Sequence, residues 1–277
     1  MLKKTQGNKV AITCLILYLL FLHKAFACSL TLAVSNDFPP YHMKNVDGHW
    51  SGLSVDLVRA LVSKTDCDLK IINVPWIRSI SLLRQGKIHL ITNFTSNAER
   101  AQFYLFLGPH HVEKAAFIAR MSLSNGIYNL SRLQYFNGVI AITRGNSFGE
   151  EFDRYVIDDV QLQSKLVQIK NNVDRYSLLI KGRIDGMFDD ELSAQYILAS
   201  THKENELFDI QFTLKGNPVY FGVSPIAVSP ELRAKLNQSW LALLEDNTVE
   251  TLYQKYDLFF DKKEFNGFEQ KLLNTKN

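Results

Sequence analysis

The sequence has few of the residues that mark disordered, collagen-like or low-complexity chains. It contains 14 glycines and 7 prolines in 277 residues, while 46% of its residues are hydrophobic and 21% are charged. This composition supplies enough apolar surface for a packed core. No internal repeat is visible, so the sequence also excludes solenoids and propellers.

The chain lacks an excess of charge of one sign once its first residues are set aside. Of its 31 Lys and Arg residues, four lie before Ala27, where there is no Asp or Glu. The remaining 27 basic residues face 28 acidic ones, a net charge of −1. This balance argues against a protein that binds nucleic acid or an anionic membrane.

No apolar run is long enough to span a membrane. The run over residues 10–22 follows a cationic start and precedes Ala25-Phe26-Ala27, which has the small residues of a signal-peptidase site. Its 13 residues would span only about 20 Å of a hydrocarbon core about 30 Å thick. We therefore predict that residues 1–27 are a cleaved signal peptide and that residues 28–277 are periplasmic.

Cysteine is scarce as well. Cys14 would leave with the signal peptide, and Cys28 and Cys67 each precede a predicted strand. Neighbouring parallel strands that begin level would bring the two sulfurs together, so we predict a Cys28–Cys67 disulfide. Two free thiols, or acylation of Cys28 in a lipoprotein, are the alternatives. Without Cys-x-x-Cys or metalloprotease-type histidine spacing, the sequence indicates no metal site and no cofactor, and we interpret His110-His111 as a turn.

The sequence does contain an alternation of β-type and helical segments, which is typical of parallel βαβ units. The predicted segments are strand 29–35, helix 53–65, strand 69–74, helix 77–85 and strand 88–92, then 138–143, 147–158, 166–169, 173–181, 185–188 and 190–199 in the same alternation, with extended segments at 115–120, 208–214 and 219–223 and a helix over 229–244. The two series predict an α/β protein of two lobes, each a mainly parallel sheet flanked by helices.

The second series is an insertion into the first. We expect lobe 1 to comprise residues 28–117 and 222–277, with a polar tail after about residue 260, and lobe 2 to comprise residues 118–221. The chain would then cross between the lobes near 116–121 and 214–224. Two extended crossovers side by side can bend together as a hinge.

One candidate site is Gly145-Asn146-Ser147-Phe148-Gly149, which satisfies G-x-S-x-G between a predicted strand and a predicted helix. In a hydrolase this turn presents a nucleophilic serine. The only histidine after Ser147 is His202, however, and it lies in a polar stretch. The same turn can instead bind an anion through the backbone amides of Asn146 and Ser147, and we favour this interpretation.

A second candidate site follows the strand at 88–92, at the sheet edge where open α/β folds bind ligands. Asn93 and Thr95 come first, and Arg100 follows five residues after Thr95. Arginine binds carboxylates through two parallel hydrogen bonds. The alternative is an arginine in a solvated turn.

A third candidate site is the run Asp189-Asp190-Glu191 at the end of the strand over 185–188. Capping of the next helix explains one acid, and another can face a cleft and pair with an ammonium group. Phe38, Tyr41 and Trp76 lie in loops after strands, where aromatic rings either cover a ligand or pack into the core.

Together these segments resemble the family 3 periplasmic solute-binding proteins, the polar amino-acid receptors of ABC importers, over nearly all of residues 29–256. The segments that carry the resemblance are Phe38-Pro39-Pro40-Tyr41, Gly52 to Leu57, Leu82 to Ile88, Thr95 with Glu99-Arg100, Arg144 to Ser147, Gly182 to Asp185, and Tyr253 to Tyr256. The resemblance implies the two-lobed periplasmic-binding-protein fold with the ligand in the cleft.

The resemblance also implies roles for individual residues. The arginine matching Arg100 holds the ligand α-carboxylate, helped by the residues matching Thr95 and Ser147. The acid matching Asp190 receives the α-ammonium group, and the aromatic residue matching Phe38 covers the ligand side chain. The expected function is non-catalytic binding of a small zwitterionic or anionic metabolite, with a membrane ABC permease as partner, no nucleic acid and a monomeric state.

Three positions leave the ligand open. His89 and Phe148 depart from the family pattern. Arg78, in Trp76-Ile77-Arg78, is either a second cationic contact for an anionic ligand or a residue of the helix surface.

Two other classes of function also stay open. One is a secreted enzyme like cyclohexadienyl dehydratase, with Asp189, Asp190 or Glu191 as its acid. The other is a sensor that signals to a membrane partner.

Overall fold

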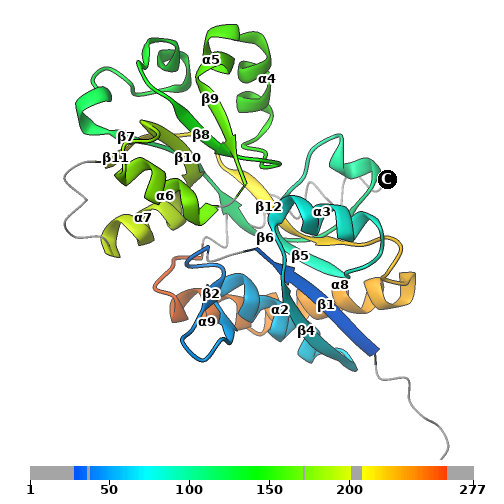
Figure 1. The fold of residues 1–277 in the computed structure, drawn as a ribbon. Coiled ribbons are helices and arrows are strands. Elements are labelled where there is room, and N and C mark those ends of the chain that lie inside the picture. The colour runs from blue at the N-terminus through cyan, green and yellow to red at the C-terminus, as the bar shows by residue number, and fades with distance from the viewer. Residues whose placement is uncertain (1–27, 36–37, 171, 201–207, 261–277) are drawn as a thin grey trace, which may run out of the picture.

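The computed structural model describes residues 28–35, 38–170, 172–200 and 208–260, and two lobes make up this part of the chain (Figure 1). Each lobe is built on a five-stranded sheet. The predicted signal peptide, the tail after residue 260 and His202 lie outside the described residues. Within the described ranges, no helix has the length and apolar character needed to cross a bilayer.

The first lobe has the strand order β4-β1-β5-β12-β6, in which β12 runs antiparallel to both of its neighbours. Its elements are β1 (Cys28–Val34), β2 (Met43–Lys44), β3 (Trp50–Ser51), α2 (Leu53–Ser63), β4 (Cys67–Asn73), α3 (Trp76–Arg84), β5 (Leu90–Thr95), η1 (Arg100–Gln102), β6 (Leu105–Glu113), β12 (Asn217–Val223), α8 (Pro230–Glu245) and α9 (Thr248–Lys255). Successive side chains of a strand point to opposite faces. Leu30 and Leu32 therefore pack with α2, α8 and α9, while Ala33 packs with α3 on the other face.

The second lobe has the strand order β11-β7-β10-β8-β9 (Figure 1). Its elements are β7 (Ala115–Arg120), η2 (Met121–Leu123), η3 (Leu130–Tyr135), β8 (Ile140–Thr143), α4 (Glu150–Asp158), α5 (Val160–Lys165), β9 (Leu166–Ile169), α6 (Asn172–Ile180), β10 (Gly186–Asp190), α7 (Glu191–Ser200) and β11 (Phe208–Thr213). Phe117 and Phe188 pack toward α4 and α5, and their neighbours Ile118 and Met187 pack toward α6 and α7. Each lobe thus has apolar cores on both faces of its sheet.

The chain passes from one sheet to the other at two short connections. β6 ends at Glu113 and β7 begins at Ala115, while β11 ends at Thr213 and β12 begins at Asn217. The segments predicted as crossovers are largely strands, since β7 pairs only in the second sheet and β12 only in the first. An extended segment looks alike in sequence whether it connects or pairs. The lobe limits and the hinge stay predictions.

His110 and His111 lie within β6 and not in a turn, so that interpretation is wrong. Both side chains are buried. The His110 ring stacks on Phe221 and the His111 ring on Tyr41. Burial lowers the pKa of both histidines, to about 3 for His111, so both rings are neutral and pack as aromatic groups.

β1 and β4 begin level, with Cys28 opposite Cys67 in the parallel register. The two Cα atoms are 4.3 Å apart, and the structure joins the sulfurs in a disulfide. The Cys28 sulfur is therefore part of a disulfide and is not a free thiol. The bond ties the edge strand of the first sheet to its neighbour.

Candidate ligand-binding site

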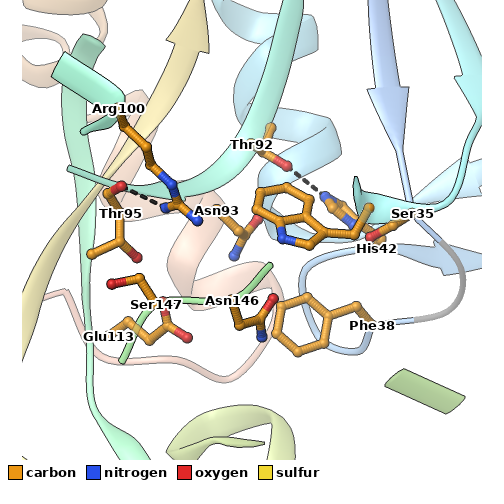
Figure 2. A pocket seen from close by; sticks show the side chains of 11 residues that line it. Ser35, Phe38, His42, Thr92, Asn93, Thr95, Arg100, Glu113, Asn146 and Ser147 are labelled. Carbon is orange, nitrogen blue, oxygen red and sulfur yellow. Dashed lines mark hydrogen bonds between the residues drawn. The ribbon is translucent and has the colours of Figure 1, made fainter. Parts of the chain in front are cut away.

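A pocket lies between the two lobes, at the carboxyl ends of β1, β5 and β8 (Figure 2). Its lining residues are Ser35, Phe38, His42, Trp76, Thr92, Asn93, Thr95, Arg100, Glu113, Asn146 and Ser147. Seven of the ten ligand-binding residues predicted from the sequence are in this set, namely Phe38, Trp76, Asn93, Thr95, Arg100, Asn146 and Ser147. Strand ends from distant parts of the chain thus meet at one place, as expected for open α/β sheets.

Arg100 is the cation of this pocket. It is 8% exposed, its Nη1 donates to the Thr95 carbonyl oxygen at 2.6 Å, and its Nη2 donates to the Gly145 carbonyl oxygen at 2.9 Å. Burial lowers the pKa of Arg100 to about 10, which leaves it charged at neutral pH. Among the described residues no carboxylate forms an ion pair with Arg100. A buried cation of this kind is suited to bind an anionic group.

Local structure explains why Arg100 points into the pocket. β5 ends at Thr95, and the Asn97 side-chain oxygen accepts a hydrogen bond from the Arg100 backbone N–H at 2.8 Å, at the start of η1. The guanidinium then lies over the Phe94 ring, 4.4 Å from its centre. The short turn and the ring hold the side chain in place before any ligand binds.

The loop after β8 brings the second lobe to Arg100. Gly145 has a φ of 81°, and a β-carbon there would lie 2.8 Å from Cδ1 of Ile77 in the first lobe. The Gly145 carbonyl oxygen also accepts a hydrogen bond from Trp76 Nε1 at 3.3 Å. The two lobes therefore touch across the pocket, and the structure is in a closed arrangement.

Ser147 lines the pocket beside Asn146. Its hydroxyl donates to Oδ2 of Asp153 in α4 at 2.9 Å. The partner of this hydroxyl is an acid and not a histidine, which argues against the esterase, whose proposed base, His202, lies outside the described residues.

Two of the three consecutive acids, Asp189 and Asp190, have separate partners. Asp189 forms a buried ion pair with Arg175 at 2.6 Å, an arginine that sequence analysis does not single out. Asp190 is 2% exposed and accepts a hydrogen bond from the Ser193 backbone N–H at 2.8 Å, which caps α7. Asp190 is not among the residues that line this pocket, so its contact with a ligand ammonium group stays a prediction. Burial raises the pKa of Asp190 to about 7, and Asp189 adds to this effect.

Glu113 supplies the pocket carboxylate that sequence analysis misses. It is the last residue of β6 and lines the pocket. Burial and the charge of Asp190 raise the pKa of Glu113 well above its ordinary range. Assigning 105–113 as a strand would have placed Glu113 at a strand end, but the histidine pair led to a turn being expected there.

The remaining predicted residues differ in their positions. Tyr41 is fully buried behind Phe38, with ring centres 5.2 Å apart, and does not line the pocket. Asn93 lines it with a φ of 53°, and its side-chain oxygen accepts a hydrogen bond from Ser54. Arg78 is exposed on α3 and outside the pocket, so the structure places no second cationic contact there.

The two departures from the family pattern lie outside the pocket. His89 Nδ1 accepts the Thr31 backbone N–H at 3.0 Å, next to the sheet, and Phe148 packs on Phe152 and Phe188 in the second lobe. They therefore bear on folding and not on direct ligand contact. No group of three or more potential metal ligands gathers anywhere in the described ranges.

Comparison with known proteins shows the family to which the chain belongs. Residues 30–259 match the model of the bacterial extracellular solute-binding proteins, family 3. The chain therefore belongs to this family, which confirms the resemblance inferred from the sequence. Among curated relatives, "Putative ABC transporter arginine-binding protein 2" of Escherichia coli K12 is 23% identical over 82% of this chain and 90% of the relative. The histidine-binding periplasmic protein of Salmonella typhimurium LT2 is 26% identical over 79% of this chain and 84% of the relative.

Solved structures show the same fold. An ancestral arginine-binding protein bound to arginine superposes with a TM-score of 0.71 at 22% identity, over 82% of this chain and 97% of that one. A histidine kinase sensor domain has the same fold, with a TM-score of 0.72 at 19% identity over 83% of this chain and 96% of that one. An ancestral amino-acid-binding protein described as a precursor of cyclohexadienyl dehydratase has it too, with a TM-score of 0.67 at 20% identity over 82% of this chain and 94% of that one. The predicted two-lobed α/β fold is thereby confirmed. The expectation of mainly parallel sheets is wrong, because each sheet is mixed, with two parallel and two antiparallel strand pairings. One fold thus serves importer receptors, sensors and an enzyme precursor.

Proposed function

We propose that this protein is a periplasmic receptor that closes around an amino acid and presents it to an ABC importer without catalysis. The observation that carries the proposal is the buried guanidinium of Arg100, which has no ion-pair partner among the described residues and lies in a pocket enclosed by both lobes. Relatives named for arginine and histidine binding support an amino acid as the ligand.

Closure gives the receptor its mechanism. The ligand carboxylate binds Arg100 from the first lobe and the Asn146–Ser147 loop from the second. The ligand makes both sets of contacts only when the lobes are closed. A ligand shifts a two-state equilibrium only by its difference in affinity for the two states, and these bridging contacts supply that difference.

A thermal-shift screen of the exported protein against the twenty L-amino acids tests the proposal. A ligand at 100 times its dissociation constant stabilises a protein by about 2.7 kcal/mol. We expect one amino acid, or a few related ones, to raise the melting temperature. The absence of a shift with every amino acid would contradict the proposal.

A dehydratase is the second candidate, because Glu113 lines the pocket and its pKa is raised well above the ordinary range, mainly by burial. A carboxyl group that holds its proton near neutral pH can act as a general acid. Incubation with prephenate or arogenate, followed by product analysis, separates the enzyme from the receptor. Co-purification from membranes with a kinase in place of a permease would indicate a sensor.

A further inference from the structure

Glu113 has an unusual position for an acid. It ends β6, one residue before the chain enters the second lobe, and lies in the pocket beside Thr95 and Ser147 (Figure 2). Its carboxylate makes no ion pair and no hydrogen bond with another described residue. Glu113 is intermediate in exposure, so its carboxylate loses only part of its hydration in the pocket, but no cation compensates for that loss, which costs stability.

The neighbouring charges increase this cost. The groups that act on Glu113 are Asp190 and Asp189 from β10, Arg100 from η1 and Arg175 from α6. Arg175 is already engaged by Asp189, and Asp190 already caps α7. Arg100 donates to two carbonyl oxygens and is not bonded to Glu113. Glu113 is therefore the acid of this group that faces the cavity without a cation of its own.

We infer that Glu113 is a ligand-binding residue. Its carboxylate accepts hydrogen bonds from the positively charged nitrogen of the ligand, while Arg100 donates hydrogen bonds to the ligand carboxylate. The site then selects amino acids over analogues that carry the same carboxylate and side chain but no ammonium group. Asp190, behind Glu113, acts on this nitrogen through its charge. The inference rests on the proposed receptor function and adds a specificity-determining residue to it.

A second consequence follows from the chemistry of the carboxyl group. Burial and the charge of Asp190 raise the pKa of Glu113 in the free protein. A ligand cation favours the ionised form, so binding releases a proton to the buffer. A residue with a merely structural role would produce no such release.

The experiment compares the wild type with Glu113→Gln and Glu113→Asp. The probes are the amino acid that binds tightest among the twenty and its 2-hydroxy acid, in which a hydroxyl replaces the ammonium group. We expect calorimetry to show at least about 30-fold weaker binding of the amino acid to Glu113→Gln, a loss typical of breaking a buried charge pair. Glu113→Asp should recover part of the affinity.

The same variant should lose its preference between the two probes and the proton release measured in phosphate and Tris buffers at pH 7. Glu245→Gln is the matched control, because Glu245 is exposed at the end of α8 and the change removes the same charge. Without ligand, Glu113→Gln should melt no lower than the wild type, since it relieves repulsion with Asp190.

The outcomes separate the two proposals. If no amino acid binds the wild type, the receptor function fails, and the role of Glu113 fails with it. If an amino acid binds and Glu113→Gln keeps wild-type affinity and preference, the receptor stands and the inference about Glu113 is wrong.

Discussion

At the scale of single residues, the pocket holds one buried cation, Arg100, and one partly buried acid, Glu113, which are not bonded to each other. Arg100 and Glu113 both line the cavity, and each carries a pKa shifted by burial. Water-poor surroundings strengthen electrostatic interactions with a ligand. The affinity for a charged ligand should therefore depend on a few side chains.

The first prediction concerns Arg100. Arg100→Ala should weaken amino-acid binding by about 2 to 5 kcal/mol because it leaves the ligand carboxylate buried and unpaired, or about 30-fold to several thousand-fold. Arg100→Lys keeps the charge but cannot form the two parallel hydrogen bonds of arginine, so its affinity should lie between those of the wild type and Arg100→Ala. Isothermal calorimetry measures all three affinities, and an unchanged value in Arg100→Ala would remove Arg100 from the site.

The second prediction concerns Asp190, whose pKa of about 7 is raised mainly by burial. The folded protein then holds a proton that the unfolded chain releases near pH 4, so its free energy of unfolding falls as the pH rises from about 4 to about 7. Asp190→Asn keeps the acceptor for Ser193 N–H and removes this loss. Without ligand it should melt several degrees above the wild type at pH 8.

At pH 4 the two proteins should melt alike, because Asp190 is then protonated in the folded wild type. Thermal melts followed by circular dichroism at pH 4, 6 and 8 measure the difference. A gap that is the same at all three pH values would show that Asp190 titrates normally.

At the scale of elements, each lobe is stabilised separately and the lobes meet at small contacts. In the first sheet, the edge strand β4 pairs only with β1 within the described residues, and the disulfide joins these two strands. The contact between lobes is made instead by Arg100, Trp76 and Ile77 against Gly145. Stability and closure are therefore set by different elements.

The third prediction concerns the disulfide. Cys28 and Cys67 are 39 residues apart, and closing a loop of this size stabilises a protein by about 4 kcal/mol in the chain-entropy model. The double variant Cys28→Ser and Cys67→Ser should lose up to this amount in urea unfolding. Because the bond joins the first residues of β1 and β4, whereas the pocket lies at the carboxyl end of β1, ligand affinity should stay within a factor of about two. Two free thiols in the intact mass of the wild type would contradict the bond.

At the scale of the whole molecule, the proposed receptor function depends on closure of the two lobes. Trp76 is the tryptophan that lines the pocket, whereas Trp240 is buried in the core of the first lobe and Trp50 packs at its surface. Its indole donates to Gly145 of the second lobe at 3.3 Å. Trp76 therefore reports the distance between the lobes.

The fourth prediction uses this residue. Addition of a binding amino acid should change the tryptophan fluorescence of the wild type and of Trp50→Phe, but not of Trp76→Phe. Small-angle scattering should show a smaller radius of gyration with ligand in all three proteins. A radius that does not respond to a saturating ligand would mean that binding and closure are uncoupled.

The sequence by itself indicated most of the elements and their order, although it missed the strand β6. Hydrophobic periodicity is a local property, so the βα alternation and the helix that begins at Ser229-Pro230 could be predicted from neighbouring residues. The carboxyl ends of strands gather at one sheet edge, so residues after strands, such as Arg100 and Ser147, could be assigned to a common site before any coordinates.

The tertiary structure decided which of several similar side chains faces the ligand. Arg175 of α6 forms an ion pair with Asp189 of β10, a contact between two elements that the pattern of neighbouring residues does not indicate. Residues two apart on a helix differ by roughly 200° in direction, so Arg78 points to solvent when Trp76 lines the pocket. Glu113 entered the site because β6 ends where the chain crosses between lobes. Direction and charge pairing depend on contacts between distant segments, and only the folded chain sets them.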